Sequence, residues 1–184
     1  ARAMRIEELD WSETEWGTIS LRRRHDPVTD REVHEVKLDE DFLMSSQFTL
    51  GEEEVARLGL AALGGDSLRV LVGGLGLGYT AWTALADPRV AELVVIEALE
   101  QVIDWHRREL FEDTRGLATD PRVRLVRDDF FELVRSGRTE RPYDALLVDW
   151  QLPDGSGLDW IRRLRQQGNA TPVVVLSARD LISD

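Results

Sequence analysis

The chain contains one strand-and-turn motif, Leu68-Arg69-Val70-Leu71-Val72-Gly73-Gly74-Leu75-Gly76-Leu77-Gly78. Its first five residues are nearly all apolar, which is typical of a strand that is buried on both faces. The glycines that follow turn the chain tightly and let a ligand approach the backbone. Tyr79–Leu85 then begins a helix. A strand, a glycine-rich turn and a helix in this order predict the first unit of a parallel α/β sheet.

Acidic residues stand where the later strands are expected to end. Val90–Glu97 is the next predicted strand, and it places Glu97 about 20 residues after the glycines, the separation at which a carboxylate meets ribose hydroxyls. Predicted strands at 123–126 and 145–148 are followed by Asp128-Asp129 and Asp149. Because open parallel sheets bind ligands at the carboxyl ends of their strands, this pattern predicts a nucleoside site. Its candidate ligand-binding residues are Gly73, Gly74, Gly76, Gly78, Glu97, Asp128 and Asp129.

The glycine pattern favours one class of nucleoside over another. The strict dinucleotide fingerprint needs a further glycine where Tyr79 stands, so the motif fits S-adenosyl-type nucleosides better than NAD. A purely structural interpretation stays open, in which the glycines only allow a helix to pack closely on a strand and Glu97 is a solvated strand end.

The remaining sequence divides into two parts. Residues 6–46 alternate polar and apolar side chains, which predicts a small antiparallel β unit, and we place this domain at residues 1–48. Residues 49–184 alternate strands and helices, with later helices expected at 99–111, 130–134 and 157–167 and a last strand at 172–176. The expected fold class is therefore α/β, a Rossmann-like doubly wound parallel sheet with a small N-terminal antiparallel β unit.

Composition sets limits on function. A net charge of -12 opposes binding to nucleic acid or to an acidic membrane surface and is compatible with a cationic substrate such as a polyamine. No segment has the roughly 18 apolar residues of a membrane span, and the chain does not begin with the apolar core of a signal peptide, so we expect a cytoplasmic protein. There is no cysteine, and His25, His34 and His106 lack metal-ligand spacing. We therefore expect no metal, and we expect these histidines at the surface or on amphipathic faces.

Residues 40–148 resemble the spermidine synthase (aminopropyltransferase) family, which has a class I S-adenosylmethionine-type fold. Val70–Gly78 is similar to the glycine motif of the family, and Val94-Val95-Ile96-Glu97 is similar to its ribose-binding acidic strand. Asp120-Pro121-Arg122-Val123 through Asp129 resembles the strand that carries an adenine-side aspartate. Tyr143-Asp144-Ala145-Leu146-Leu147-Val148-Asp149 resembles the strand whose terminal aspartate deprotonates the attacking amine.

The resemblance implies a set of functional expectations. Asp149 would be the general base, and decarboxylated S-adenosylmethionine or S-adenosylmethionine would be the co-substrate, with an amine such as a polyamine as acceptor. Related synthases pair as dimers, so a homodimer is a further expectation. Two features depart from the family pattern. Gly76 stands where an aspartate usually helps to hold the amine of the donor, and the tyrosine–histidine pair near the polyamine is not apparent after Glu54.

Residues 143–184 resemble a second family, the response-regulator receiver domains. The similarity lies in Asp149-Trp150-Gln151-Leu152-Pro153-Asp154-Gly155-Ser156-Gly157-Leu158 and in Thr171-Pro172-Val173-Val174-Val175-Leu176-Ser177-Ala178. This resemblance implies that Asp149 accepts a phosphoryl group and that Ser177 senses it. A receiver also uses an acidic pair to hold Mg²⁺ and a lysine on its fifth strand, whereas the sole lysine here is Lys37.

Three hypotheses follow from the two resemblances. The chain is a nucleoside-binding transferase related to spermidine synthase, a receiver-like phospho-acceptor, or a chimeric or truncated fold without catalytic activity. The sequence alone does not decide among them.

Overall fold

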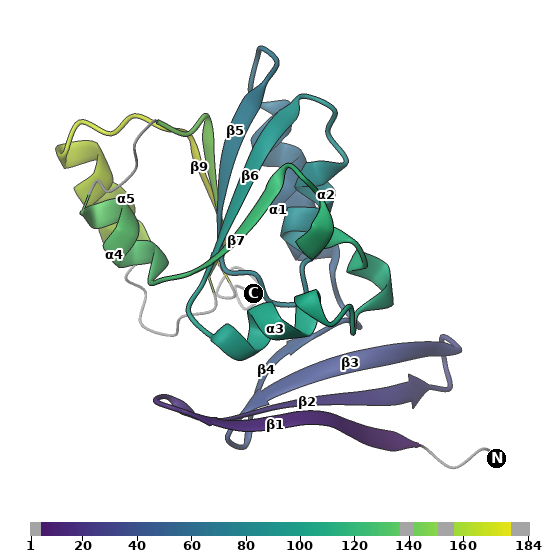
Figure 1. Cartoon of the computed structure of the whole chain (residues 1–184). Coiled ribbons are helices and arrows are strands. Elements are labelled where there is room, and N and C mark those ends of the chain that lie inside the picture. The colour runs from purple at the N-terminus through teal and green to yellow at the C-terminus, as the bar shows by residue number, and fades with distance from the viewer. Residues whose placement is uncertain (1–4, 137–141, 151–156, 178–184) are drawn as a thin grey trace, which may run out of the picture. The chain divides into compact units, whose positions relative to one another are not determined.

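The chain folds into two compact units, Ala1–Thr49 and Leu50–Asp184, and each is described separately (Figure 1). The structure is a computed structural model, and it describes residues 5–136, 142–150 and 157–177.

The first unit is a four-stranded antiparallel sheet in the order β1-β2-β3-β4. Its strands are β1 (Ile6–Thr14), β2 (Gly17–Asp26), β3 (Arg31–Leu38) and β4 (Asp41–Ser45). Glu35 of β3 lies opposite Arg22 of β2, and its carboxylate accepts hydrogen bonds from Arg22 and Arg24. The predicted antiparallel β unit is confirmed.

The second unit is built on a five-stranded parallel sheet in the order β7-β6-β5-β8-β9. The strands are β5 (Leu68–Gly73), β6 (Val90–Glu97), β7 (Val123–Arg127), β8 (Ala145–Trp150) and β9 (Val173–Ser177). The helices are α1 (Leu50–Ala61), α2 (Tyr79–Leu85), α3 (Glu100–Arg107), α4 (Phe130–Arg135) and α5 (Gly157–Gln166), with short 3-10 turns at Glu112–Thr114 and Leu117–Thr119.

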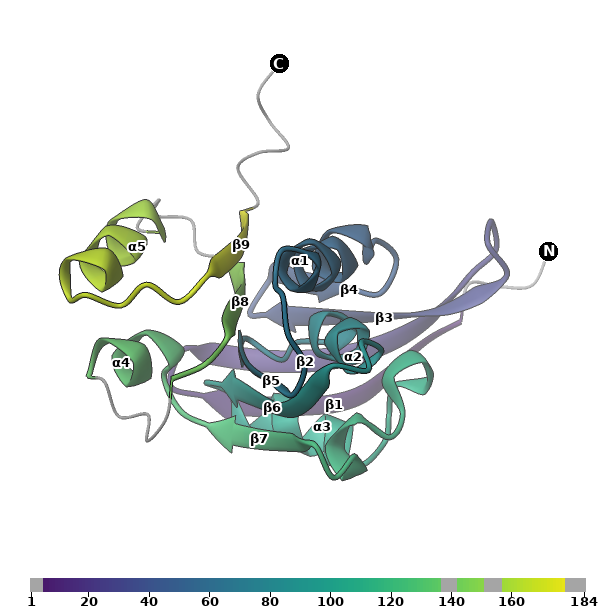
Figure 2. The same cartoon turned by 90° about the horizontal axis from the view of Figure 1, so that it is seen from above.

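Helices cover both faces of this sheet. Figures 1 and 2 show α1 and α2 on one face and α4 and α5 on the other. Leu71, Val94 and Ile96 from the middle strands are at most 1% exposed, and Phe130 of α4 and Leu164 of α5 pack with them in one buried cluster. The predicted Rossmann-like doubly wound fold is confirmed.

The third helix is shorter than the sequence suggests. A helix was expected over 99–111, but α3 ends at Arg107. Glu109 adopts a left-handed backbone conformation with φ of 55°, which a continuing α-helix does not allow. The apolar residues after it, Leu110 and Phe111, therefore enter a turn instead of extending the helix.

The strand order determines where a ligand can reach the sheet. The chain runs outward from β5 to β6 and β7, then returns to the other side of β5 to form β8 and β9. Because all five strands are parallel, their carboxyl ends share one edge, and a crevice is expected beside β5, where the direction of winding changes.

Gly73 provides a test of the packing of α4 on β5. A Cβ at this position would lie 2.8 Å from two ring atoms of Phe130, and a buried ring cannot yield as a flexible side chain does. We expect Gly73→Ala to lower the free energy of unfolding by about 1–3 kcal/mol.

Gly64→Ala is the matched control, because a Cβ there would meet no atom within 4 Å. It should leave the free energy of unfolding unchanged or raise it by up to about 1 kcal/mol. Urea denaturation measures both variants, and equal stability of the two would contradict the packing described here.

Candidate nucleoside site

The glycine-rich turn joins β5 to α2 at the carboxyl edge of the sheet. Gly74, Gly76 and Gly78 have positive φ values of 93°, 50° and 90°, a region that side chains other than that of glycine rarely adopt. Between them, Leu75 and Leu77 are buried, whereas Gly74 and Gly76 are half-buried. The two leucines anchor the turn in the core, and Gly74 and Gly76 leave backbone partly accessible.

Glu97 brings its carboxylate to this turn. Its Oε1 accepts hydrogen bonds from the amides of Leu75 at 3.1 Å and Gly76 at 3.4 Å, and its Oε2 accepts one from Leu99 at 3.0 Å. The structure therefore places together the glycine turn and the acidic residue that the sequence proposed for one site. Contact of Glu97 with a ribose stays a prediction.

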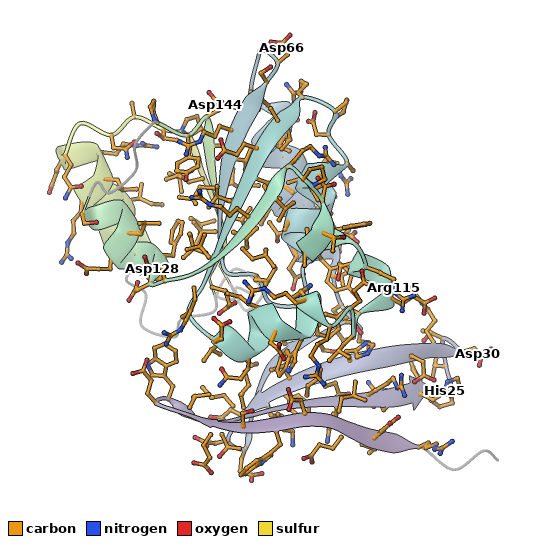
Figure 3. The ribbon with its side chains drawn as sticks, viewed as in Figure 1. His25, Asp30, Asp66, Arg115, Asp128 and Asp144 are labelled. Carbon is orange, nitrogen blue, oxygen red and sulfur yellow. The ribbon has the colours of Figure 1, made fainter. Side chains whose placement is uncertain are left out.

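The structure gives Asp128 and Asp129 different surroundings. The amide of Asp128 donates to the carbonyl of Glu97 at 3.2 Å, so Asp128 continues the same edge, at the end of β7 (Figure 3). The exposed carboxylate of Asp129 accepts the amide of Glu132 at 3.1 Å, which makes it the cap of α4. Asp128 is thus the neighbour of Glu97, and Asp129 has a structural task.

Figure 3 also shows the opposite edge of the sheet. Asp66 and Asp144 precede β5 and β8, and both lie at the end of the sheet away from Asp128. Their acidic charge is therefore separated from the glycine turn by the length of the strands.

Gly73 and Asp149 belong to adjacent strands. Gly73 of β5 is in register with Val148 of β8, so the backbone of Asp149 follows directly beside the start of the glycine turn. Ser177 ends β9 and is in register with Trp150. The side chains of Asp149 and Ser177 lie outside the described part of the structure, as do residues 151–156 and 178–184 of the receiver-like stretch.

His106 is a residue of this region that the sequence analysis missed. It lies on α3 and is 4% exposed, on the buried side of the helix with Val102 and Ile103, which is the amphipathic-face position of the two that were expected for the histidines. Its Nε2 lies 2.8 Å from the carbonyl oxygen of Gly76. The spacing of 102, 103 and 106 is that of one helix face, which is the signal that could have indicated burial.

The pKa of His106 follows from this burial. Desolvation lowers it from 6.5 to about 4, and the hydrogen bond to Gly76 opposes this only in part. Because a carbonyl oxygen only accepts, Nε2 carries the hydrogen and the ring is neutral near pH 7. In the other unit, His25 is partly exposed, and its ring nitrogens lie 3.2 Å from Asp30 and 3.4 Å from Glu32.

Two features are absent from the described residues. Within 5–136, 142–150 and 157–177, no group of three or more histidine, cysteine, aspartate or glutamate residues could hold a metal ion. In the same residues, no helix combines the length and the apolar character needed to cross a bilayer.

Solved structures with a similar fold include spermidine synthases. A spermidine synthase in complex with the transition-state analogue AdoDATO superposes with a TM-score of 0.70 over 92% of this chain, at 20% identity. The chain has the spermidine synthase fold. It covers 56% of that synthase.

Sequence relatives reflect the two resemblances. Putrescine N-methyltransferase 2 of Nicotiana tabacum is 30% identical over 111 residues, which are 60% of this chain and 31% of the enzyme. Residues 119–184 match the response regulator receiver domain, a longer stretch than 143–184. The response regulator protein PmrA of Pseudomonas aeruginosa is 52% identical over 42 residues, 23% of this chain and 19% of that protein. The chain thus combines a spermidine synthase fold with a receiver-like sequence, and it spans less than a third of the length of either sequence relative.

The low pKa of His106 makes stability depend on pH. Above pH 6.5 the ring is neutral in both the folded and the unfolded chain. As the pH falls from 6.5 to about 4, His106 becomes protonated in the unfolded chain but stays neutral in the folded chain. The free energy of unfolding therefore decreases over this interval. We expect the wild type to lose on the order of 3 kcal/mol more than His106→Gln over this interval. Urea denaturation across the interval measures it, and parallel curves for the two proteins would refute the burial of a neutral imidazole.

Proposed function

We propose that the Leu50–Asp184 unit binds an S-adenosyl-type nucleoside at the carboxyl ends of β5, β6 and β7, and transfers an aminopropyl or methyl group from it to an amine. The observation that carries the proposal is the position of the Glu97 carboxylate on the amides of the glycine turn. An acid suited to bind ribose and a turn with accessible backbone are thereby hydrogen-bonded to each other, and both groups suit a nucleoside.

Asp128 extends this arrangement along the sheet. Its amide is bonded to the carbonyl of Glu97, so a ligand whose ribose lies at Glu97 would meet Asp128 next. A carboxylate can accept a hydrogen bond from an exocyclic amine, which suits the adenine end of the ligand. We assign that end to Asp128 and leave Asp129, the cap of α4, out of the binding site.

Asp149 supplies the chemistry that the proposal needs. A protonated amine is not a nucleophile, so a base must take its proton before its lone pair attacks the carbon next to the sulfonium. The new nitrogen–carbon bond forms as the carbon–sulfur bond breaks, and the sulfur leaves as a neutral thioether with the bonding electrons. We assign this proton to Asp149, which follows Val148, the partner of Gly73 in β8.

The relatives support transfer of either an aminopropyl or a methyl group, and they do not favour one of the two. The solved synthase was captured with AdoDATO, and the tobacco enzyme is named for methylation of putrescine. Glycine at position 76 removes the aspartate that the synthase motif usually carries for the amine of the donor. The donor is identified by comparing the affinities for decarboxylated and intact S-adenosylmethionine. For the acceptor, the net charge of -12 favours a cationic amine.

Glu97 provides the test of nucleoside binding. We expect Glu97→Ala to weaken binding of methylthioadenosine, S-adenosylmethionine and its decarboxylated form at least about 100-fold, because two ribose hydroxyls lose a charged acceptor. Calorimetric titration measures the affinities. Glu100→Gln is the control, since Glu100 is an exposed acid three residues away that pairs with Arg107. Unchanged affinity in Glu97→Ala would remove Glu97 from the site, and no binding by the wild type would end the proposal.

A receiver-like phospho-acceptor at Asp149 is the second candidate, favoured by the family match over 119–184. The strand order counts against it. The pair that could imitate the Mg²⁺-binding acids of a receiver, Asp128-Asp129, directly follows β7, and β6 and β5 separate β7 from β8. Neighbouring strands lie about 4.8 Å apart, so the three spacings from β7 to β8 separate the acidic pair from Asp149 by about 14 Å. This distance is too long for the three carboxylates to bind one Mg²⁺.

Asp149→Asn distinguishes the two functions. Under the proposed transfer, the variant keeps the wild-type affinity for nucleoside and loses transfer to putrescine by at least about 100-fold, because the base is gone. Under the alternative, acetyl phosphate with Mg²⁺ labels the wild type and not the variant. Radioactive transfer and labelling assays measure the two activities. Full transfer by Asp149→Asn would contradict the assignment of the base.

A further inference from the structure

The three glycines of the turn cannot fix its conformation by themselves. Gly74, Gly76 and Gly78 all have positive φ, and glycine has more backbone freedom than any other residue. A turn of this composition takes its shape from the groups that bind its amides and carbonyls. In the described structure, groups from β6, from α3 and from the segment after α3 do so, in addition to backbone bonds within the turn and with α2.

Gly76 lies at the centre of these contacts. Its amide donates to Glu97, and its carbonyl accepts a hydrogen bond from His106 Nε2 at 2.8 Å. The amide and the carbonyl belong to consecutive peptide planes that meet at the Cα of Gly76, so the two bonds together restrict φ and ψ of this residue. The imidazole is therefore coupled to the carboxylate through a single glycine.

The next residues of the turn are held from the same side. The hydroxyl of Thr114 donates to the carbonyl of Leu77 at 3.0 Å. Gly78 lies against the imidazole, because a Cβ there would be 2.7 Å from His106 Cε1 and 3.3 Å from Thr114 Cβ. His106 and Thr114 thus form one support under the carbonyls of two consecutive residues.

We propose that His106, with Thr114, is a positioning residue that holds the glycine turn in the conformation in which Glu97 is presented to a nucleoside. The proposal rests on the nucleoside-binding function proposed above. His106 itself is 4% exposed and needs no contact with the ligand, since it acts through the backbone of Gly76.

The surroundings of the ring favour the neutral imidazole over its protonated form. The ring touches Gly76, Gly78 and Phe111, and the 4.9 Å between its centroid and that of Phe111 is an aromatic contact. The charged groups on the packed elements have other partners: Glu97 accepts the amides of the turn, Asp113 accepts the hydroxyl of Tyr79, and Arg107 pairs with Glu100.

Two variants separate the hydrogen bond from the volume of the side chain. His106→Leu fills a similar space without a donor, whereas His106→Gln retains an N–H donor that does not titrate. Thr114→Val removes the hydroxyl at nearly constant volume and tests the second half of the support. Arg107→Gln changes an exposed neighbour on the same helix and is the control.

Amide hydrogen exchange, read by NMR without ligand, measures the turn directly. We expect exchange of the Leu75 and Gly76 amides to be about 10-fold faster in His106→Leu and in Thr114→Val, with Val70 and Leu71 in β5 unchanged. His106→Gln and Arg107→Gln should stay within about 3-fold of the wild type. Wild-type exchange at Leu75 and Gly76 in both His106→Leu and Thr114→Val, or exchange in His106→Gln as fast as in His106→Leu, would overturn the proposal.

Titration with methylthioadenosine then links the turn to function. Affinity should fall about 10-fold in His106→Leu and recover in His106→Gln, in parallel with the exchange rates. If the wild type binds no nucleoside, the proposed function fails, while the exchange rates still decide whether His106 holds the turn. Loss of protection in His106→Leu without any loss of affinity would overturn the link to Glu97.

Discussion

The hydrogen bonds between the Glu97 carboxylate and the amides of Leu75 and Gly76 hold together the parts of the candidate site in the second unit. They join the end of β6 to the turn that leaves β5, so two neighbouring strands end in one shared structure. The adjoining contacts extend it: Asp128 bonds to the backbone of Glu97, and His106 bonds to the backbone of Gly76. The site is in this sense a network of backbone groups arranged around one carboxylate.

The sequence was sufficient for the parts of the molecule that depend on local pattern. Apolar runs identified β5 and β6, and the distance from the glycines to Glu97 indicated which acid would meet the turn. It was insufficient where the partner is remote in the chain. His106 is 30 residues from Gly76, and no local pattern reports that contact. Asp128 and Asp129 are adjacent in sequence, and only the start of α4 shows which one caps a helix.

The two family resemblances overlap at β8, where both families have the same sequence pattern. Both families end a parallel strand in aspartate, and β8 with Asp149 satisfies either pattern. The two functions require different neighbours for this strand. Here that neighbour is β5 with its glycine turn, and the acidic pair at the end of β7 lies beyond two intervening strands. The local sequence around Asp149 fits both functions equally well, whereas the strand order favours nucleoside binding over phospho-acceptance.

The sheet also has a simple division. One ladder, between β5 and β8, joins the strands β5, β6 and β7 to the strands β8 and β9. The hydrogen bonds of a parallel ladder are formed by backbone groups alone, so this ladder can persist while the side chains of the strand beside β5 change. A βαβ segment of different ancestry can join such a sheet without altering the strands already present. The fold can thus acquire new sequence at one seam while the residues around Glu97 keep their places.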